Sequence, residues 1–150
     1  MTVRLRAMRS SDVDVLLPFE QELFAGDPPW TAEQFRSELA GVPHTRWYVV
    51  AEETGVLVGY AGLSNSGDTS DVQTLAVVHG SQRQGVGTAL LDALVAEARR
   101  RGAHEMLLDV REDNAPALAF YARHGFERLS ARRGYYANGR IDGLVLRRIL

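Results

Sequence analysis

A glycine-containing turn at residues 82–87 is the part of this chain best suited to binding a phosphorylated ligand. Its sequence, Gln-Arg-Gln-Gly-Val-Gly, follows an apolar run at 72–78 and precedes a helical pattern that begins near Thr88. The first N–H groups of a helix have no internal partner and attract negative charge, and glycine lets the backbone approach a ligand closely. The turn therefore predicts a phosphate or pyrophosphate site, although a plain strand-to-helix turn with a glycine hinge has the same pattern.

Two common phosphate-binding loops are excluded by the residues present. A Walker loop needs Gly-Lys followed by Ser or Thr, and the chain contains no lysine. A dinucleotide loop needs Gly-x-Gly-x-x-Gly, which Gly85, Gly87 and Ala89 do not provide. The turn does resemble Gln/Arg-x-x-Gly-x-Gly/Ala, the pyrophosphate loop of the GNAT acetyltransferases, which hold coenzyme A. Gln82, Gly85 and Gly87 occupy its defined positions.

The elements that must position this turn predict an α/β domain with a mixed sheet. Strand patterns cover residues 3–7, 46–53, 56–63, 71–78, 105–111, 126–136 and 141–149. Helix patterns cover residues 10–24, 31–41, 85–101 and 115–124. A capping box of Thr31 and Gln34 opens the second helix, Pro18 is expected to break or kink the first, and 65–69 reads as a polar loop. With no linker or repeat, we expect one domain spanning 1–150.

Composition bounds the possible partners. The net charge is −2, which gives no electrostatic reason to expect nucleic-acid or membrane binding. The chain has no cysteine, so disulfides, thiolate metal sites and a cysteine acyl-enzyme are excluded. His44, His79, His104 and His124 are scattered, and we expect surface or loop positions and no metal site for them.

The same numbers give an expected location and assembly. No apolar run approaches the ~20 residues of a membrane span, and the first residues have no signal-peptide pattern. We therefore expect a cytoplasmic protein. No long apolar stripe is left unassigned, which favours a monomer or weak dimer.

A second segment strengthens the resemblance to the GNAT superfamily. Residues 114–126 resemble its Asn-x-x-Ala-x-x-x-Tyr-x-x-x-Gly-Phe pattern closely, and the predicted order of elements is also that of the family. The resemblance implies a mixed, mostly antiparallel seven-stranded sheet flanked by about four helices and splayed at the acetyl-CoA site. Within the superfamily, segments 19–21, 29–30, 108–111 and 132–136 look like the RimI branch, the ribosomal protein bS18-alanine N-acetyltransferases.

The resemblance also implies which residues hold acetyl-CoA. The backbone of Leu75, Ala76 and Val77 would pair with the pantetheine arm like an extra strand. The pyrophosphate would lie against the turn and the helix start, at Gln82, Arg83, Gln84, Gly85, Val86, Gly87 and Thr88. Asn114, an expected helix N-cap, and Tyr121 would lie beside the pantetheine. Gln82 could equally be an ordinary surface residue.

Acetyl transfer to an amine needs a base for the amine and an acid for the departing thiolate. By resemblance Tyr121 is the acid, although a packed aromatic side chain would also suit its place on the helix. Asp109 stands where the RimI branch has a glutamate base. Because aspartate is one methylene shorter, direct contact with the amine and a water relay both stay open. The alternative is an exposed carboxylate paired with Arg111. Asp71 and Glu20 are rival carboxylates.

The acceptor side is implied by the same resemblance. Tyr135 and Tyr136 would flank the entry, Trp30 would form the opposite wall, and Glu20 and Asp71 would contact the substrate. An α-amine with a pKa near 8 is about one tenth neutral at pH 7, whereas lysine is neutral to about four parts in ten thousand. A base that is poorly placed to remove a proton therefore favours an N-terminal amine over a lysine as the acceptor.

The expected function is acetyl-CoA-dependent acetylation of a protein N-terminus, the alanine of ribosomal protein bS18, by direct attack in a ternary complex. The alternatives are acetylation of a polyamine, amino acid or aminoglycoside, and a non-catalytic acetyl-CoA-binding module.

Overall fold

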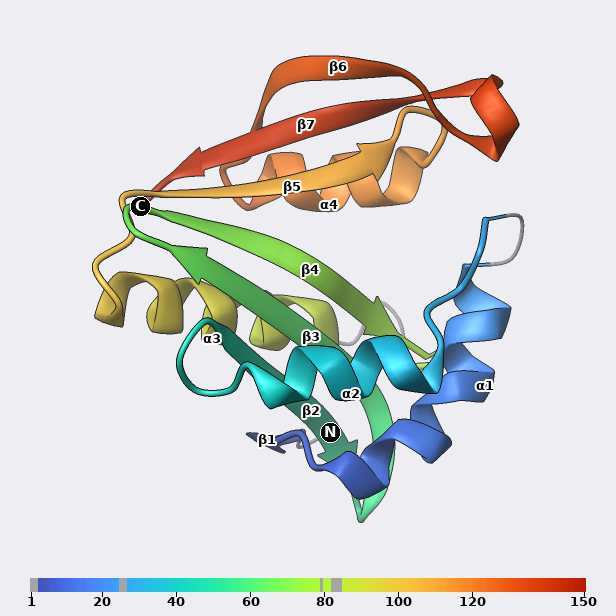
Figure 1. Cartoon of the computed structure of the whole chain (residues 1–150), viewed down its shortest axis with the longest axis vertical. Coiled ribbons are helices and arrows are strands. Elements are labelled where there is room, and N and C mark those ends of the chain that lie inside the picture. The colour runs from blue at the N-terminus through green and yellow to red at the C-terminus, as the bar shows by residue number, and fades with distance from the viewer. Residues whose placement is uncertain (1–2, 25–26, 79, 82–84) are drawn as a thin grey trace.

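The computed structural model describes residues 3–24, 27–78, 80–81 and 85–150 (Figure 1). The strands are β1 (Arg4–Ala7), β2 (Arg46–Glu53), β3 (Val56–Ser66), β4 (Thr69–Val77), β5 (Glu105–Arg111), β6 (Glu127–Tyr136) and β7 (Ile141–Ile149). The helices are α1 (Val13–Leu23), α2 (Ala32–Ala40), α3 (Val86–Arg100) and α4 (Ala115–Arg123), with short 3-10 turns at Ser10–Asp12 and Ala137–Gly139. The predicted seven strands and four helices, and their order, are confirmed.

The seven strands form one sheet in the order β1-β2-β3-β4-β5-β7-β6. Every neighbouring pair is antiparallel except β4 and β5. These two parallel strands pair only from Thr69 to Asp71 on β4 and from Glu105 to Leu107 on β5, and then diverge (Figure 1). The predicted splay of the sheet is therefore confirmed, and the remainder of β4 turns one edge toward the gap.

Two hydrophobic clusters hold helices on opposite faces of the sheet. Along β2, Val49 and Ala51 belong to the cluster that includes α3, whereas Tyr48 and Val50 belong to the cluster that includes α1 and α2. Successive side chains of a strand point to opposite faces, so the two clusters lie on opposite sides. The cluster with α3 continues to α4 through Tyr121. Both helices that could contact a ligand in the gap are thus anchored on the same face.

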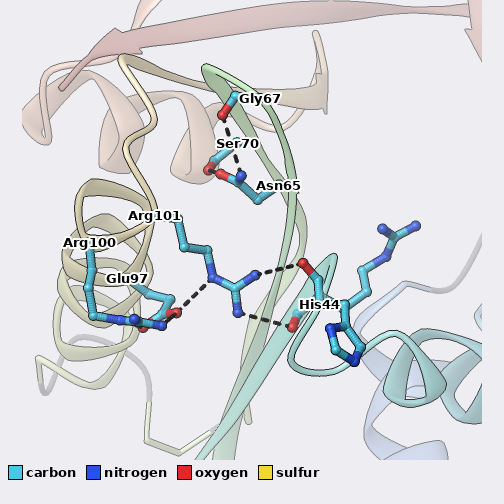
Figure 2. A network of polar contacts seen from close by, with 8 residues as sticks. His44, Asn65, Gly67, Ser70, Glu97, Arg100 and Arg101 are labelled. Carbon is cyan, nitrogen blue, oxygen red and sulfur yellow. Dashed lines mark hydrogen bonds and ion pairs between the residues drawn. The ribbon is translucent and has the colours of Figure 1, made fainter.

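Pro18 does not break α1, and one loop prediction was wrong. Helix α1 runs from Val13 to Leu23 through Pro18. A proline removes only one backbone hydrogen bond, and buried Leu16 and Glu20 anchor the helix on both sides of it. The predicted loop at 65–69 is only a short turn, since β3 extends to Ser66 and β4 begins at Thr69. Across this hairpin the Ser70 hydroxyl donates to the Asn65 side chain at 2.5 Å (Figure 2), so these polar residues satisfy each other within the ladder.

The C-terminal end of α3 is tied to the start of β2 (Figure 2). Arg101 donates from Nε to the buried carboxylate of Glu97 at 2.7 Å and from its terminal nitrogens to the backbone oxygens of His44 and Arg46 at 3.5 and 3.4 Å. The far end of α3 is thereby fixed against the sheet, which also fixes the direction in which its N-terminus points.

The capping box predicted for α2 is confirmed and gives a stability test. Thr31 Oγ1 accepts from the Gln34 N–H at 3.2 Å, and the Gln34 side chain accepts from the Thr31 N–H at 2.7 Å. Thr31→Ala should lower the free energy of unfolding by about 1 kcal/mol, measured by urea denaturation. Thr31→Ser keeps the acceptor oxygen and serves as the control. Equal stability of the alanine variant and the wild type would contradict the role of this cap.

Candidate active site

Two cavities open where β4 and β5 diverge. The hairpin cavity, of about 530 Å³, lies between these strands, the segment after α1 and the β6–β7 hairpin. The helix cavity, of about 790 Å³, lies between the end of β4, the start of α3 and α4. The residues that line both are Leu75, Asn114, Pro116, Ala117 and Tyr121. Because they share this wall, ligands in the two cavities can meet beside Tyr121.

The start of α3 gives the helix cavity its anion-binding character. Gly85 is the N-cap with φ +83°, a left-handed conformation that glycine adopts without strain. Ala89 N–H donates to Gly85 O at 3.0 Å, so the N–H groups of Val86, Gly87 and Thr88 are among those that a helix leaves without an internal partner. Gly85, Gly87 and Thr88 line the cavity. The other three predicted loop residues, Gln82, Arg83 and Gln84, lie outside the described residues.

Strand β4 supplies the second donor and acceptor set for an extended ligand. Leu75 lines both cavities and Val77 lines the helix cavity, whereas Ala76 is buried and pairs with Tyr60 of β3. Among the described strands, β4 and β5 pair only as far as Asp71 on β4, so beyond this residue the edge of β4 borders the gap. An extended pantetheine arm can pair with such an edge, so the residues present fit coenzyme A.

Tyr121 is the buried phenol at the junction of the cavities. Its ring contacts those of Phe120 and Phe126 at 5.2 and 5.4 Å between centroids. Burial raises the pKa of Tyr121 to about 12, and none of the described residues forms a hydrogen bond with its hydroxyl. The predicted N-cap of its helix is confirmed, because Asn114 Oδ1 accepts from the Ala117 N–H at 3.2 Å. The phenol is therefore protonated at neutral pH and free to donate into the shared space.

Asp109 lies on β5 and lines the hairpin cavity, with its side chain 34% exposed. Its Oδ1 lies 2.9 Å from Nε of Arg132. The alternative pairing of Asp109 with Arg111 was wrong. The Arg111 guanidinium pairs instead with Asp113 at 2.9 Å and with Asp27. The Asp109 carboxylate is thus held by β6 and still reaches the cavity.

The rival carboxylates differ in their surroundings. Asp71 lies beside Leu107 on the paired part of β4 and lines neither cavity. Burial, followed by the charges of Asp109 and Glu105, raises the pKa of Asp71. Glu20 is buried in the wall of the hairpin cavity and accepts hydrogen bonds from the Trp30 N–H at 3.2 Å and the Tyr60 hydroxyl at 2.9 Å.

Each Glu20 oxygen therefore has a protein donor, and burial raises the pKa of this carboxyl. This geometry suits a structural part of the wall better than a base that must exchange a proton with a substrate.

The aromatic residues predicted at the entry divide into two groups. Trp30 and Tyr136 line the hairpin cavity, and Trp30 packs edge-on against Phe35 at 5.1 Å. Tyr135 is 53% exposed, does not line that cavity, and lies beneath the Arg132 guanidinium at 5.3 Å. The structure therefore brings Glu20, Trp30, Asp109 and Tyr136 to one cavity and leaves Tyr135 outside it.

Sequence reasoning missed a connection that closes one side of the hairpin cavity. Asp27 accepts a hydrogen bond from the Ala137 N–H at 3.0 Å and pairs with Arg111. The Ala137 N–H and the Arg111 guanidinium lower the pKa of Asp27. The Arg111 guanidinium also lies 5.8 Å from the centre of the Tyr136 ring. Residues so far apart in the chain give no local signal of their contact.

His124 lies in the turn directly after α4, which agrees with the expected loop position, but its side chain has a packed role that was not predicted. The side chain is half-buried between α4 and the start of α3, with Nδ1 2.8 Å from the Phe120 carbonyl and Nε2 3.1 Å from Thr88 Oγ1. Its position directly before Gly125, at the end of α4, was the one sequence signal of a packed role.

No helix in the described part of the chain is both long enough and apolar enough to span a membrane. Among the same residues, no three histidine or acidic side chains are grouped closely enough to hold a metal ion.

Comparisons with known proteins agree on one family. The model of the Acetyltransferase (GNAT) family matches residues 14–126. The chain is 39% identical to the N-alpha-acetyltransferase RimI of Mycobacterium tuberculosis over 97% of this chain and 92% of the relative. It is 30% identical to the ribosomal protein bS18-alanine N-acetyltransferase of Escherichia coli over 95% and 94%. The crystal structure of the Escherichia coli ribosomal-protein-S18-alanine N-acetyltransferase matches with a TM-score of 0.87 at 28% identity over 99% and 94% of the chains.

Proposed function

This chain belongs to the GNAT family and is an acetyl-CoA-dependent acetyltransferase, and we propose that its acceptor is a protein N-terminus, with the alanine of ribosomal protein bS18 as the substrate. The observation that carries this proposal is the junction at Tyr121, where a cavity suited to coenzyme A meets an open cavity suited to an extended chain. Two relatives support an N-terminal amine as the acceptor, because one is named an N-alpha-acetyltransferase and the other a ribosomal protein bS18-alanine N-acetyltransferase.

In the proposed arrangement the helix cavity holds the acetyl donor. The N–H groups of residues 86–88 bind the pyrophosphate, and the edge of β4 that borders the gap pairs with the pantetheine arm. Acetyl-CoA, when bound, supplies the activated thioester. A backbone N–H near Leu75 or Ala76 polarises the thioester carbonyl as a preorganised donor.

The acid lies on α4 and the base on β5. Tyr121 donates its phenolic proton to the departing thiolate. Its pKa of about 12 keeps the phenol protonated at neutral pH, so the proton is present when the thiolate leaves. Asp109 accepts the proton of the incoming amine through a water molecule, since its side chain is short and already contacts Arg132. The amine attacks the thioester directly, and the chain contains no cysteine that could form an acyl-enzyme.

The hairpin cavity takes the first residues of the acceptor. Trp30 and Tyr136 form its apolar walls. Its rim carries two carboxylates, Asp27 and Asp113, and one cation, Arg111, which pairs with both of them, so the rim is acidic. An acidic rim favours a basic peptide through complementary charge. An α-amine also needs less help from a base than a lysine does, because about one tenth of it is neutral at pH 7.

Mass spectrometry with acetyl-CoA tests this proposal. Three acceptors are compared: a peptide that begins Ala-Arg, the same peptide with a blocked N-terminus and an added lysine, and a polyamine. Acetylation confined to the free alanine amine is the expected result. Acetylation of the polyamine alone would move the protein to the small-molecule acetyltransferases. Binding of acetyl-CoA without turnover of any amine would identify a non-catalytic module.

A further inference from the structure

One side chain joins the two helices that form the walls of the helix cavity. His124, at the end of α4, lies 3.1 Å from Thr88 Oγ1 on α3 and 2.8 Å from the carbonyl of Phe120 on its own helix. The imidazole also stacks on the Phe120 ring, with 4.4 Å between centroids. Thr88 and Phe120 both line the cavity. The bridge therefore lies where the pyrophosphate end of the ligand is expected.

The direction of these hydrogen bonds follows from the carbonyl. A backbone oxygen can only accept, so His124 Nδ1 carries a proton and donates it to Phe120. In the neutral ring Nε2 is then an acceptor, and the Thr88 hydroxyl donates to it. The hydroxyl proton is thereby committed to His124, which leaves the backbone N–H of Thr88 as its donor toward an anion.

The same bridge sets the separation of the two walls. A Cβ atom placed on Gly87 would lie 3.3 Å from the Phe120 ring, so α3 and α4 already approach closely here. Phe120 in turn contacts the ring of Tyr121 at 5.2 Å. A change in the position of His124 would therefore change the place of the free N–H groups relative to α4.

We propose that His124 is a positioning residue for the pyrophosphate of coenzyme A, which acts by holding Thr88 and the start of α3 against α4. It does not touch the reacting atoms. Its contribution is to keep the N–H groups of residues 86–88 aimed at the ligand, which lowers the dissociation constant for coenzyme A without changing the chemical step. This inference rests on the cofactor part of the proposed function and is independent of the acceptor.

Two amide substitutions separate the two hydrogen bonds of the ring. His124→Gln places a polar group near the position of Nε2 and can keep the bond to Thr88, whereas His124→Asn places it near Nδ1 and keeps only the bond to Phe120. Binding of coenzyme A is measured by calorimetry for both variants, for Thr88→Val and for the double variant His124→Asn/Thr88→Val. Unfolding temperatures without ligand are recorded for all of them.

We expect His124→Asn and Thr88→Val each to weaken coenzyme A binding by about 10-fold, the size of one lost hydrogen bond. The Gln variant should stay within about 3-fold of the wild type, and the double variant should lose no more than either single variant, because both remove the same bond. Saturating acetyl-CoA should restore kcat in all of them.

Three results would overturn the proposal: wild-type affinity in His124→Asn, equal losses in the Gln and Asn variants, or losses that follow the unfolding temperature. The last two would assign His124 to packing alone. Failure of the wild type itself to bind coenzyme A would instead reject the proposed function.

Discussion

Replacing Tyr121 with phenylalanine should lower kcat by about 100-fold and leave the KM for acetyl-CoA nearly unchanged. The substitution removes only the phenolic oxygen, and the ring contacts with Phe120 and Phe126 remain. The reaction should slow without stopping, because a thiol with a pKa of about 8.5 is a fair leaving group unaided. Steady-state kinetics with the Ala-Arg peptide measure the effect.

The pKa of Tyr121 adds a second readout. A phenol with a pKa of about 12 keeps its proton across the usual assay range, so its titration should cause no loss of wild-type rate between about pH 7 and pH 10. A fall in rate with a midpoint inside that range would show that the acid titrates lower and is not this buried phenol.

Tyr48→Phe is the matched control for the loss of a buried phenolic oxygen. The Tyr48 hydroxyl donates to Glu38 at 2.7 Å and lies outside both cavities. This variant should have a lower unfolding temperature and an unchanged kcat. Tyr121→Phe should instead have an unchanged unfolding temperature and a lower kcat. If Tyr121→Phe kept the wild-type kcat, Tyr121 would be a packed aromatic residue and not the acid.

Replacing Asp109 with asparagine should lower kcat/KM for the peptide by about 100-fold at pH 7, because the amine then loses its proton acceptor. The affinity for acetyl-CoA should stay the same, since Asp109 lies outside the helix cavity. The neutral fraction of an α-amine rises from about one tenth at pH 7 to about nine tenths at pH 9. The deficit of the variant should therefore shrink by up to about 10-fold over this range, which pH-dependent kinetics can measure.

Two other carboxylates provide the comparison for this result. Glu105 lies on the same strand with similar exposure, pairs with Arg147 and lies outside both cavities, so Glu105→Gln should leave the kinetics unchanged. Asp71→Asn tests the rival base. A large loss in the Asp71 variant, with near-normal kinetics in the Asp109 variant, would transfer the role of base to Asp71.

Most of the fold could be predicted because its signals are local. Strands 46–53, 105–111 and 141–149 coincide with β2, β5 and β7, since apolar runs bounded by turn residues specify their limits. The exceptions depended on tertiary contacts. Packing of Leu16 and Glu20 carried α1 across Pro18, and the Asn65–Ser70 bond extended the β3–β4 ladder through residues that resembled a loop.

The site could be predicted only in part, for the same physical reason. Motifs pointed to Tyr121, Asp109 and the start of α3, which line the two adjoining cavities, although Asp109 stands where the family pattern has a glutamate. The side chains that orient them come from distant segments: Arg132 for Asp109 and His124 for Thr88. Such pairs depend on strand register and on helix placement, which no local pattern in a single sequence encodes.

The contact between Asp27 and Ala137 joins segments 110 residues apart, and it has a consequence for the growing polypeptide. The strands and helices that surround the helix cavity are all complete once α4 has been synthesised. The wall of the hairpin cavity is complete only after the β6–β7 hairpin has been synthesised, because Tyr136 lines it and Ala137 contacts Asp27 in the segment after α1. During translation the residues that line the helix cavity are therefore all made before the hairpin cavity can be completed.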